Sequence, residues 1–318
     1  MTKLEGVIIR ERAWWRRVLS FVLLLGWGAE FCSGTASADE TKDCFFKSSD
    51  GVRLHYVEAG KGDRTLVFVP GWMMPAAVFD AQISELSKRH RVIAFDPRSQ
   101  GKSEVFNGPH SPELRSKDLH ELLQKVKAEK PILAGWSLGV MEVLDYLARY
   151  NPSNLGGLVL IDNSIGEGRS PSSTSSKPPS KPSPPLPSPE PNPEDRAAYL
   201  KRFTLGLTKK PMSQGMFDSI FSSARRVPYQ AATELIHKPY PREYWRDTLL
   251  AQKVPILYAI RPRFEEQGRL LCAKRPAQAQ MEVFLEAGHA LFIDEPARFN
   301  RLVGAFAEKT WATSSPSR

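Results

Sequence analysis

Long apolar runs and clusters of basic charge are both missing from this chain. The N-terminal apolar stretch, Val18 to Trp27, holds ten residues, whereas a helix that spans a bilayer needs about 20. The net charge of +9 (44 Lys+Arg minus 35 Asp+Glu) is spread along the sequence, without a run of five or six basic residues. The first absence indicates no membrane span in the mature chain, and the second argues against nucleic-acid binding.

Cysteine is also scarce, with three residues in 318. Cys32 belongs to the N-terminal segment described next, which leaves Cys44 and Cys272 for the folded domain. These two can form a disulfide in an oxidising compartment or stay as two thiols, because the sequence does not give the distance between their Cα atoms. Neither lies beside a histidine in the pattern of a nucleophile, so neither is expected to carry chemistry.

The segment 1–38 has the pattern of a secretory signal peptide. Four arginines between positions 10 and 17 precede the short apolar stretch, and Ala36-Ser37-Ala38 is a small-residue cleavage site. No cysteine stands at that site, which disfavours a lipoprotein. We expect cleavage after Ala38 and a periplasmic or secreted protein; an uncleaved N-terminal anchor is the alternative.

Apolar strands alternate with amphipathic helices along most of the remaining chain. The expected strands are 44–47, 52–58, 66–69, 91–95, 132–134, 158–161, 255–260 and 281–284. The expected helices are 76–88, 112–127, 138–150 and 296–308. The first two strands flank a turn signal, Ser49-Asp50-Gly51, and are expected to form an antiparallel hairpin. The later strands are apolar throughout, which predicts an α/β fold with a mostly parallel sheet covered by helices on both faces.

This alternation is interrupted once. Ser170 to Pro193 holds ten prolines and eight serines in 24 residues, a composition that cannot bury apolar surface. We therefore expect a linker at 166–194 between the first part of the sheet domain, 39–165, and a helical cap, 195–252. The second part of the domain then covers 253–310, and 311–318 is a tail. The apolar residues of the cap either line a substrate cavity or form the cap's own core. They are Phe203, Met212, Met216, Phe217, Ile220, Phe221 and Trp245.

The sequence Gly135-Trp136-Ser137-Leu138-Gly139 reads G-x-S-x-G between a strand and a helix. This is the pattern of a nucleophile elbow, in which a sharp turn exposes the serine hydroxyl at the edge of a sheet. The two glycines allow the turn to pass close to the neighbouring strand and helix. Ser137 is therefore the expected nucleophile.

Four motifs in order make the chain resemble an α/β-hydrolase with a helical cap, over nearly the whole mature sequence. They are Pro70-Gly71-Trp72, the segment 96–103, the G-x-S-x-G segment and Ala287-Gly288-His289-Ala290. The resemblance implies that His289 is the base that activates Ser137. It also implies an oxyanion hole made by the backbone N–H groups of Trp72 and Leu138. Pro70 stands where the family usually has a histidine, and that change leaves the main-chain donors in place.

The sequence marks less clearly the acidic residue that would contact the histidine and complete a catalytic triad. Family members usually carry an aspartate a few residues after the strand at 256–260, where this chain has Phe264. Asp162, at the end of the preceding strand, is the preferred candidate, because that position can also bring a carboxylate to the histidine. Glu265 or Glu266 and a missing acid are the alternatives.

The resemblance implies a serine hydrolase that cleaves a carboxylic ester or a similar small acyl substrate through an acyl-enzyme on Ser137. It implies no cofactor and no metal, and a small acyl compound as the partner; the oligomeric state is undetermined. Two alternatives share these motifs. One is amide or C–C hydrolysis or perhydrolysis on the same scaffold, and the other is a hydrolase-like binding protein without catalysis.

Overall fold

One eight-stranded sheet organises the computed structural model, which describes residues 41–168, 191–236 and 240–313. The strand order is β1-β2-β4-β3-β5-β6-β7-β8. The strands are β1 (Lys42–Lys47), β2 (Arg53–Ala59), β3 (Thr65–Val69), β4 (Arg91–Asp96), β5 (Ile132–Trp136), β6 (Gly157–Ile161), β7 (Ile256–Ile260) and β8 (Ala279–Val283). β2 pairs antiparallel with β1 and β4, and all pairs from β4 onward are parallel. The predicted hairpin and mostly parallel sheet are confirmed.

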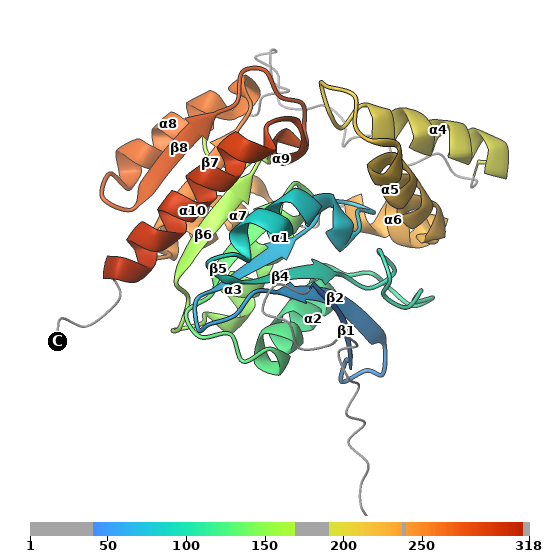
Figure 1. Ribbon diagram of the computed structural model, residues 1–318, viewed down its shortest axis with the longest axis horizontal. Helices are drawn as coiled ribbons and strands as arrows, with labels where there is room; N and C mark the ends of the chain where they lie inside the picture. Colours follow the sequence, from blue (N-terminus) through green and yellow to red (C-terminus); the bar gives the residue numbers. More distant parts are fainter. Residues whose placement is uncertain (1–40, 169–190, 237–239, 314–318) are drawn as a thin grey trace, which may run out of the picture.

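Helices cover both faces of this sheet (Figure 1). On one face α1 (Asp80–Leu86), preceded by η1 (Ala76–Phe79), packs against α10 (Pro296–Thr313), with the short α9 (Leu291–Asp294) beside them. On the other face lie α2 (Pro112–Lys125), α3 (Leu138–Tyr150) and α7 (Arg242–Ala251). The central strands β3, β5, β6 and β7 are fully buried. Their continuous apolar sequence is what a sheet covered on both sides requires.

The helices α4 (Pro193–Leu205), α5 (Gln214–Arg226) and α6 (Tyr229–Ile236) follow β6 and lie together at one end of the molecule (Figure 1). α5 is attached to the loop after β4, since Ser223 Oγ accepts a hydrogen bond from Gly101 N at 2.9 Å. α7 behaves differently, because its Trp245 and Leu249 are buried with α3 in the core of the sheet domain. The expected cap range 195–252 therefore ends on a helix that belongs to the sheet domain.

A further helix, α8 (Glu265–Lys274), follows the 3₁₀ turn η2 (Pro262–Phe264) and packs against β8. This helix was not predicted from the sequence. Cys272, on this helix, is a free thiol, so the Cys44–Cys272 disulfide does not form.

Several predicted segments fall on residues outside the described ranges. These are the signal peptide 1–38 with its cleavage site after Ala38, most of the linker 166–194 and most of the tail 311–318. Within the three described ranges, no helix is both long enough and apolar enough to cross a bilayer.

Candidate active site

Ser137 lies at a sharp turn between β5 and α3. Its backbone has φ 52° and ψ −118°, a strained conformation for a residue with a side chain. A Cβ on Gly135 would lie 2.5 Å from the carbonyl oxygen of Gly139, and one on Gly139 would lie 2.2 Å from that of Val69. Only glycine fits at either position. The turn is held in place because Ser137 N donates to Ile161 O at 3.0 Å.

Asp162 and His289 meet beside this turn. Asp162 directly follows β6, is buried, and places its Oδ2 2.6 Å from Nδ1 of His289. A carboxylate in this position selects the tautomer that leaves Nε2 of the imidazole free to accept a proton. Two contacts hold the loop of His289: Trp136 Nε1 donates to His289 O at 3.0 Å, and Ala290 N donates to Leu207 O at 2.8 Å.

The glutamates after Phe264 lie elsewhere. Glu265 starts α8 and forms an ion pair with Arg269, at 2.5 Å, one turn along the same helix. Phe264, which occupies the usual place of the acid, is buried in the core. Of the candidate acids named from the sequence, the structure brings Asp162 to His289.

Arg261 is a site residue that the sequence reasoning missed. Its backbone N donates to Asp162 Oδ1 at 3.0 Å, and its Nε donates to Asp162 Oδ2 at 2.6 Å. Its Nη2 lies 3.4 Å from Nδ1 of His289. Arg261 directly follows β7, next to the strand that ends at Asp162, so the neighbouring parallel strands were the available signal. The guanidinium compensates the buried charge of Asp162.

The second side of the site is the loop 71–74 after β3. Met74 N donates to Gly71 O at 3.2 Å, which closes a turn around Trp72 and Met73. A Cβ on Gly71 would lie 3.2 Å from Cβ of Ser137, so this loop passes directly beside the serine. Within the part of the chain that the structure describes, no acceptor is bonded to the N–H of Trp72. Leu138 is the first residue of α3, where the N–H has no partner inside the helix.

A cavity of about 210 Å³ connects these groups. Ser137, His289 and Leu138 line it together with Gly71 and Trp72, and the rest of its wall is mainly apolar. The remaining lining residues are Met74, Trp136, Met141, Asn163, Phe203, Leu207 and Ile236. Trp72 forms part of the wall: its Nε1 donates to Ala232 O of α6 at 2.8 Å, and its ring packs edge-on against Phe203 of α4. Of the predicted cap residues, Phe203 lines this cavity.

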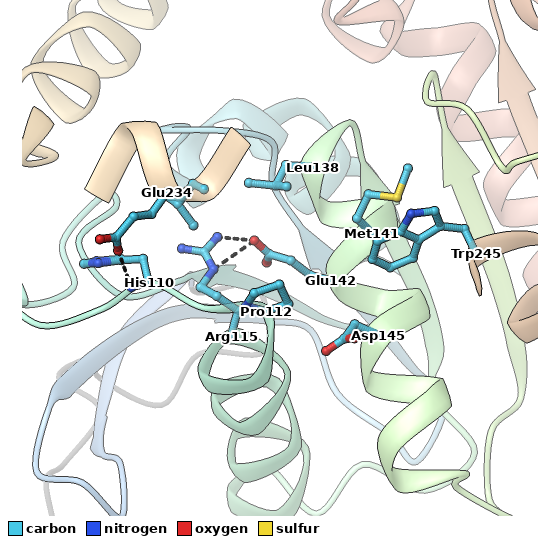
Figure 2. Close-up of a pocket in the computed structure, with 10 residues that line it drawn as sticks. His110, Pro112, Arg115, Leu138, Met141, Glu142, Asp145, Glu234 and Trp245 are labelled. Atoms are coloured by element: carbon cyan, nitrogen blue, oxygen red, sulfur yellow. Dashed lines mark hydrogen bonds and ion pairs between the residues drawn. The ribbon is translucent and has the colours of Figure 1, made fainter. Parts of the chain in front are cut away.

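A second, smaller cavity of about 30 Å³ adjoins the first behind Leu138 and Met141, which line both (Figure 2). Its floor carries the buried ion pair of Arg115 and Glu142, in which Arg115 Nε donates to Glu142 Oε1 at 2.8 Å. Burial raises the pKa of Glu142, and Arg115 opposes that rise. The space suits one or two water molecules rather than a substrate group.

His110 lies at the rim of this smaller cavity and is held neutral. Burial, with a further contribution from the charge of Arg115, lowers the pKa of His110 to about 4. Its Nε2 is 2.8 Å from Ser99 Oγ, and its Nδ1 is 2.9 Å from Gly108 O. These two contacts fit a neutral imidazole that donates from Nδ1 and accepts at Nε2. His110 is therefore a structural residue of the loop before α2.

Among the described residues, no three His, Cys, Asp or Glu side chains lie together in a way that would hold a metal ion.

Comparison with known proteins agrees with this architecture. The pattern of the Alpha/beta hydrolase family matches residues 66–302. The chain is 24% identical over 276 residues to the AB hydrolase superfamily protein YisY of Bacillus subtilis (strain 168), covering 83% of this chain and 98% of that protein. It is 33% identical over 116 residues to the human serine hydrolase BPHL, covering 35% of this chain and 40% of BPHL.

A solved structure described as a putative aryl esterase from Burkholderia cenocepacia superposes with a TM-score of 0.69 at 20% identity. That match covers 85% of this chain and 99% of the other. At this identity the likeness concerns the fold. The family pattern spans well over half of the chain, from the third strand into the last helix. The resemblance predicted from the four motifs is confirmed, and the chain belongs to the alpha/beta hydrolase family.

Proposed function

We propose that the protein is a serine hydrolase that cleaves a carboxylic ester of a small acyl group. Ser137 attacks the carbonyl carbon while Nε2 of His289 takes the hydroxyl proton. The backbone N–H groups of Trp72 and Leu138 hold the developing oxyanion. His289 then returns the proton to the leaving alcohol, and water releases the acyl group from Ser137 by the same steps.

One observation carries this proposal: His289, which contacts Asp162 at 2.6 Å, lines the same cavity as Ser137, and Ser137 lies at a strained elbow. Asp162 stabilises the imidazolium that forms when His289 accepts the proton. The mainly apolar wall of the cavity, with Trp72 and Phe203, favours an uncharged acyl chain over an acidic or basic one.

A fluorophosphonate probe tests the nucleophile. We expect it to label the native protein at Ser137, with no labelling of a folded Ser137→Ala variant. A panel of p-nitrophenyl esters from acetate to octanoate then measures the acyl preference, and the matching anilides test amide cleavage. Native protein that stays folded and unlabelled would contradict the proposal and favour a binding protein without catalysis.

Perhydrolysis is a second candidate. Two relatives that match about a third of this chain are described as a non-heme chloroperoxidase of Streptomyces lividans and a bifunctional esterase/perhydrolase of Acinetobacter calcoaceticus. In such a reaction hydrogen peroxide replaces water as the acyl acceptor, so the acyl-enzyme is shared and only the second half differs. Peracid formation from an acetate ester and hydrogen peroxide, measured beside hydrolysis of the same ester, separates the two activities.

We also propose that the protein acts outside the cytoplasm, on the basis of the arginine-rich start, the short apolar stretch and the Ala36-Ser37-Ala38 site. N-terminal sequencing of the protein recovered from an export-competent host tests this. A mature chain starting at Asp39 is expected, and an intact N-terminus in the cytoplasm would contradict it.

A further inference from the structure

The side chain of Gln100, in the loop after β4, is completely buried and uses its whole hydrogen-bonding capacity. Its Nε2 donates to Gly71 O at 3.1 Å and to Met74 O at 2.9 Å. Its Oε1 accepts from Met73 N at 3.2 Å and from Arg115 Nη2 at 3.3 Å. A side-chain amide has two donor hydrogens and two acceptor lone pairs, so none is left over.

Three of these four bonds go to the loop 71–74, on both sides of Trp72. Met73 has φ 60° at the third position of the turn, where a type II turn normally requires glycine. A side chain makes that conformation unfavourable, so the loop needs outside contacts to keep it. Gln100 supplies them and leaves the N–H of Trp72 unpaired. Pro70, in the position where a histidine usually precedes the glycine, has no polar side chain to do so.

The fourth bond connects Gln100 to the other side of the oxyanion hole. Arg115, which donates to Gln100, also donates through Nε to Glu142 of α3 at 2.8 Å (Figure 2). α3 begins at Leu138, whose N–H is the second proposed donor. Gln100, Arg115 and Glu142 thus form one buried chain of hydrogen bonds between the two backbone segments whose N–H groups must converge on a single oxygen.

We propose that Gln100 is a positioning residue for the oxyanion hole, and that it sets the N–H of Trp72 relative to that of Leu138 through Arg115 and Glu142. This inference rests on the proposed hydrolase activity. Gln100 touches no reacting atom. Its effect is on the transition state, because a donor that is displaced by a fraction of an ångström still permits substrate binding but stabilises the oxyanion less.

The test compares Gln100→Leu with Gln82→Leu. Gln82 on α1 is equally buried, and its Nε2 donates to Phe292 O at 3.1 Å and to Asn300 Oδ1 at 3.0 Å, neither of which belongs to the loop 71–74. Both variants lose a buried amide, so both are expected to lower the melting temperature. The readouts are kcat and KM for p-nitrophenyl butyrate, and the affinity for an alkylboronic acid that forms a tetrahedral adduct on Ser137.

For Gln100→Leu we expect kcat to fall at least tenfold, toward the roughly 10²–10³-fold cost of losing one oxyanion donor. KM should change by less than about threefold, and boronate affinity should fall in step with kcat, because the adduct resembles the transition state. Gln82→Leu should keep kcat within about threefold of the native value. If Gln100→Leu does not fold, Gln100→Glu serves instead. It keeps the acceptors and loses both donors to Gly71 O and Met74 O, so the same fall in kcat is expected.

Two outcomes overturn the inference in distinguishable ways. If the native protein is active and the Gln100 variant loses no more kcat than the Gln82 variant, Gln100 is merely structural and the proposed function stands. If the native protein neither turns over esters nor reacts with the fluorophosphonate, the proposed function fails and the inference fails with it.

Discussion

Replacing Asp162 with asparagine should remove the contact that fixes the tautomer of His289. The carboxylate of Asp162 accepts from Arg261 N at 3.0 Å and Arg261 Nε at 2.6 Å, and it lies 2.6 Å from His289 Nδ1. An asparagine has only one carbonyl oxygen, and when this oxygen takes the place of Oδ1 it keeps the bond from Arg261 N and loses the one from Arg261 Nε, which goes to Oδ2. Its NH₂ group then faces Nδ1 of His289 and favours the tautomer in which Nε2 carries the proton. That tautomer cannot accept the proton of Ser137.

The expected loss in kcat is therefore about 10⁴-fold, the size found when a triad aspartate is changed to asparagine with the geometry kept. The substitution also leaves the guanidinium of Arg261 without its partner charge. Removing one partner of a buried pair costs about 3–5 kcal/mol. Since the side chain of Arg261 is 24% exposed, water replaces part of the lost contact, and we expect about 1–3 kcal/mol.

The assay measures ester hydrolysis well below the melting temperature, with urea unfolding measured in parallel. Fluorophosphonate labelling of Ser137 should slow together with kcat. Glu265→Gln is the matched control, because it removes a carboxylate that pairs with Arg269 on α8, and it should leave kcat within about twofold. If Asp162→Asn retains a tenth or more of the activity while Glu265→Gln abolishes it, the assignment of the acid is wrong.

Three further predictions concern the cavity, the pH dependence and the elbow. Trp72→Ala removes the wall between the cavity of about 210 Å³ and an apolar cavity of about 140 Å³ beside Tyr199. The preferred p-nitrophenyl ester should then have a longer acyl chain than in the native protein. An unchanged preference would show that Trp72 does not limit the length of the acyl chain. The pKa of His110 is lowered from 6.5 to about 4, so the folded protein favours the neutral imidazole. The resulting stabilisation of the fold, up to about 3 kcal/mol, is fully present above pH 6.5 and is lost as the pH falls toward 4. His110→Asn should flatten the dependence of the unfolding free energy on pH in that window, and an unchanged slope would contradict this origin. Gly139→Ala places a Cβ 2.2 Å from Val69 O and should prevent folding or abolish activity. The control is Gly215→Ala, whose Cβ has nothing within 4 Å, and which should stabilise α5 by about 0.5–1 kcal/mol. If the two variants have equal effects in thermal unfolding, a steric clash at Gly139 does not explain the need for glycine in the elbow.

The local periodicity of the sequence was sufficient for most of the fold. Each buried strand is a continuous apolar run, and the elbow is marked by two glycines around Ser137, so β3 to β7 and α3 could be placed from the residues alone. α8 was not predicted, although Pro262 and the two acidic residues Glu265 and Glu266 mark its start. α7 was grouped with the cap because its amphipathic pattern does not say which apolar surface it contacts.

In the candidate site, too, some residues could be predicted from the sequence and others only from the folded structure. The sequence by itself determined the elbow around Ser137 and the late loop that carries His289, because both depend on local backbone geometry and on chain order. Only the tertiary structure decided which carboxylate reaches His289, since Asp162 and Glu265 are both a short distance along the chain from a strand end, and side-chain direction separates them. The contacts of Arg261 and Gln100 also depend on strands and loops that are adjacent in space but distant in sequence. Hydrogen bonds of that kind leave no periodic pattern in a single sequence, which is why these two residues became visible only in the folded chain.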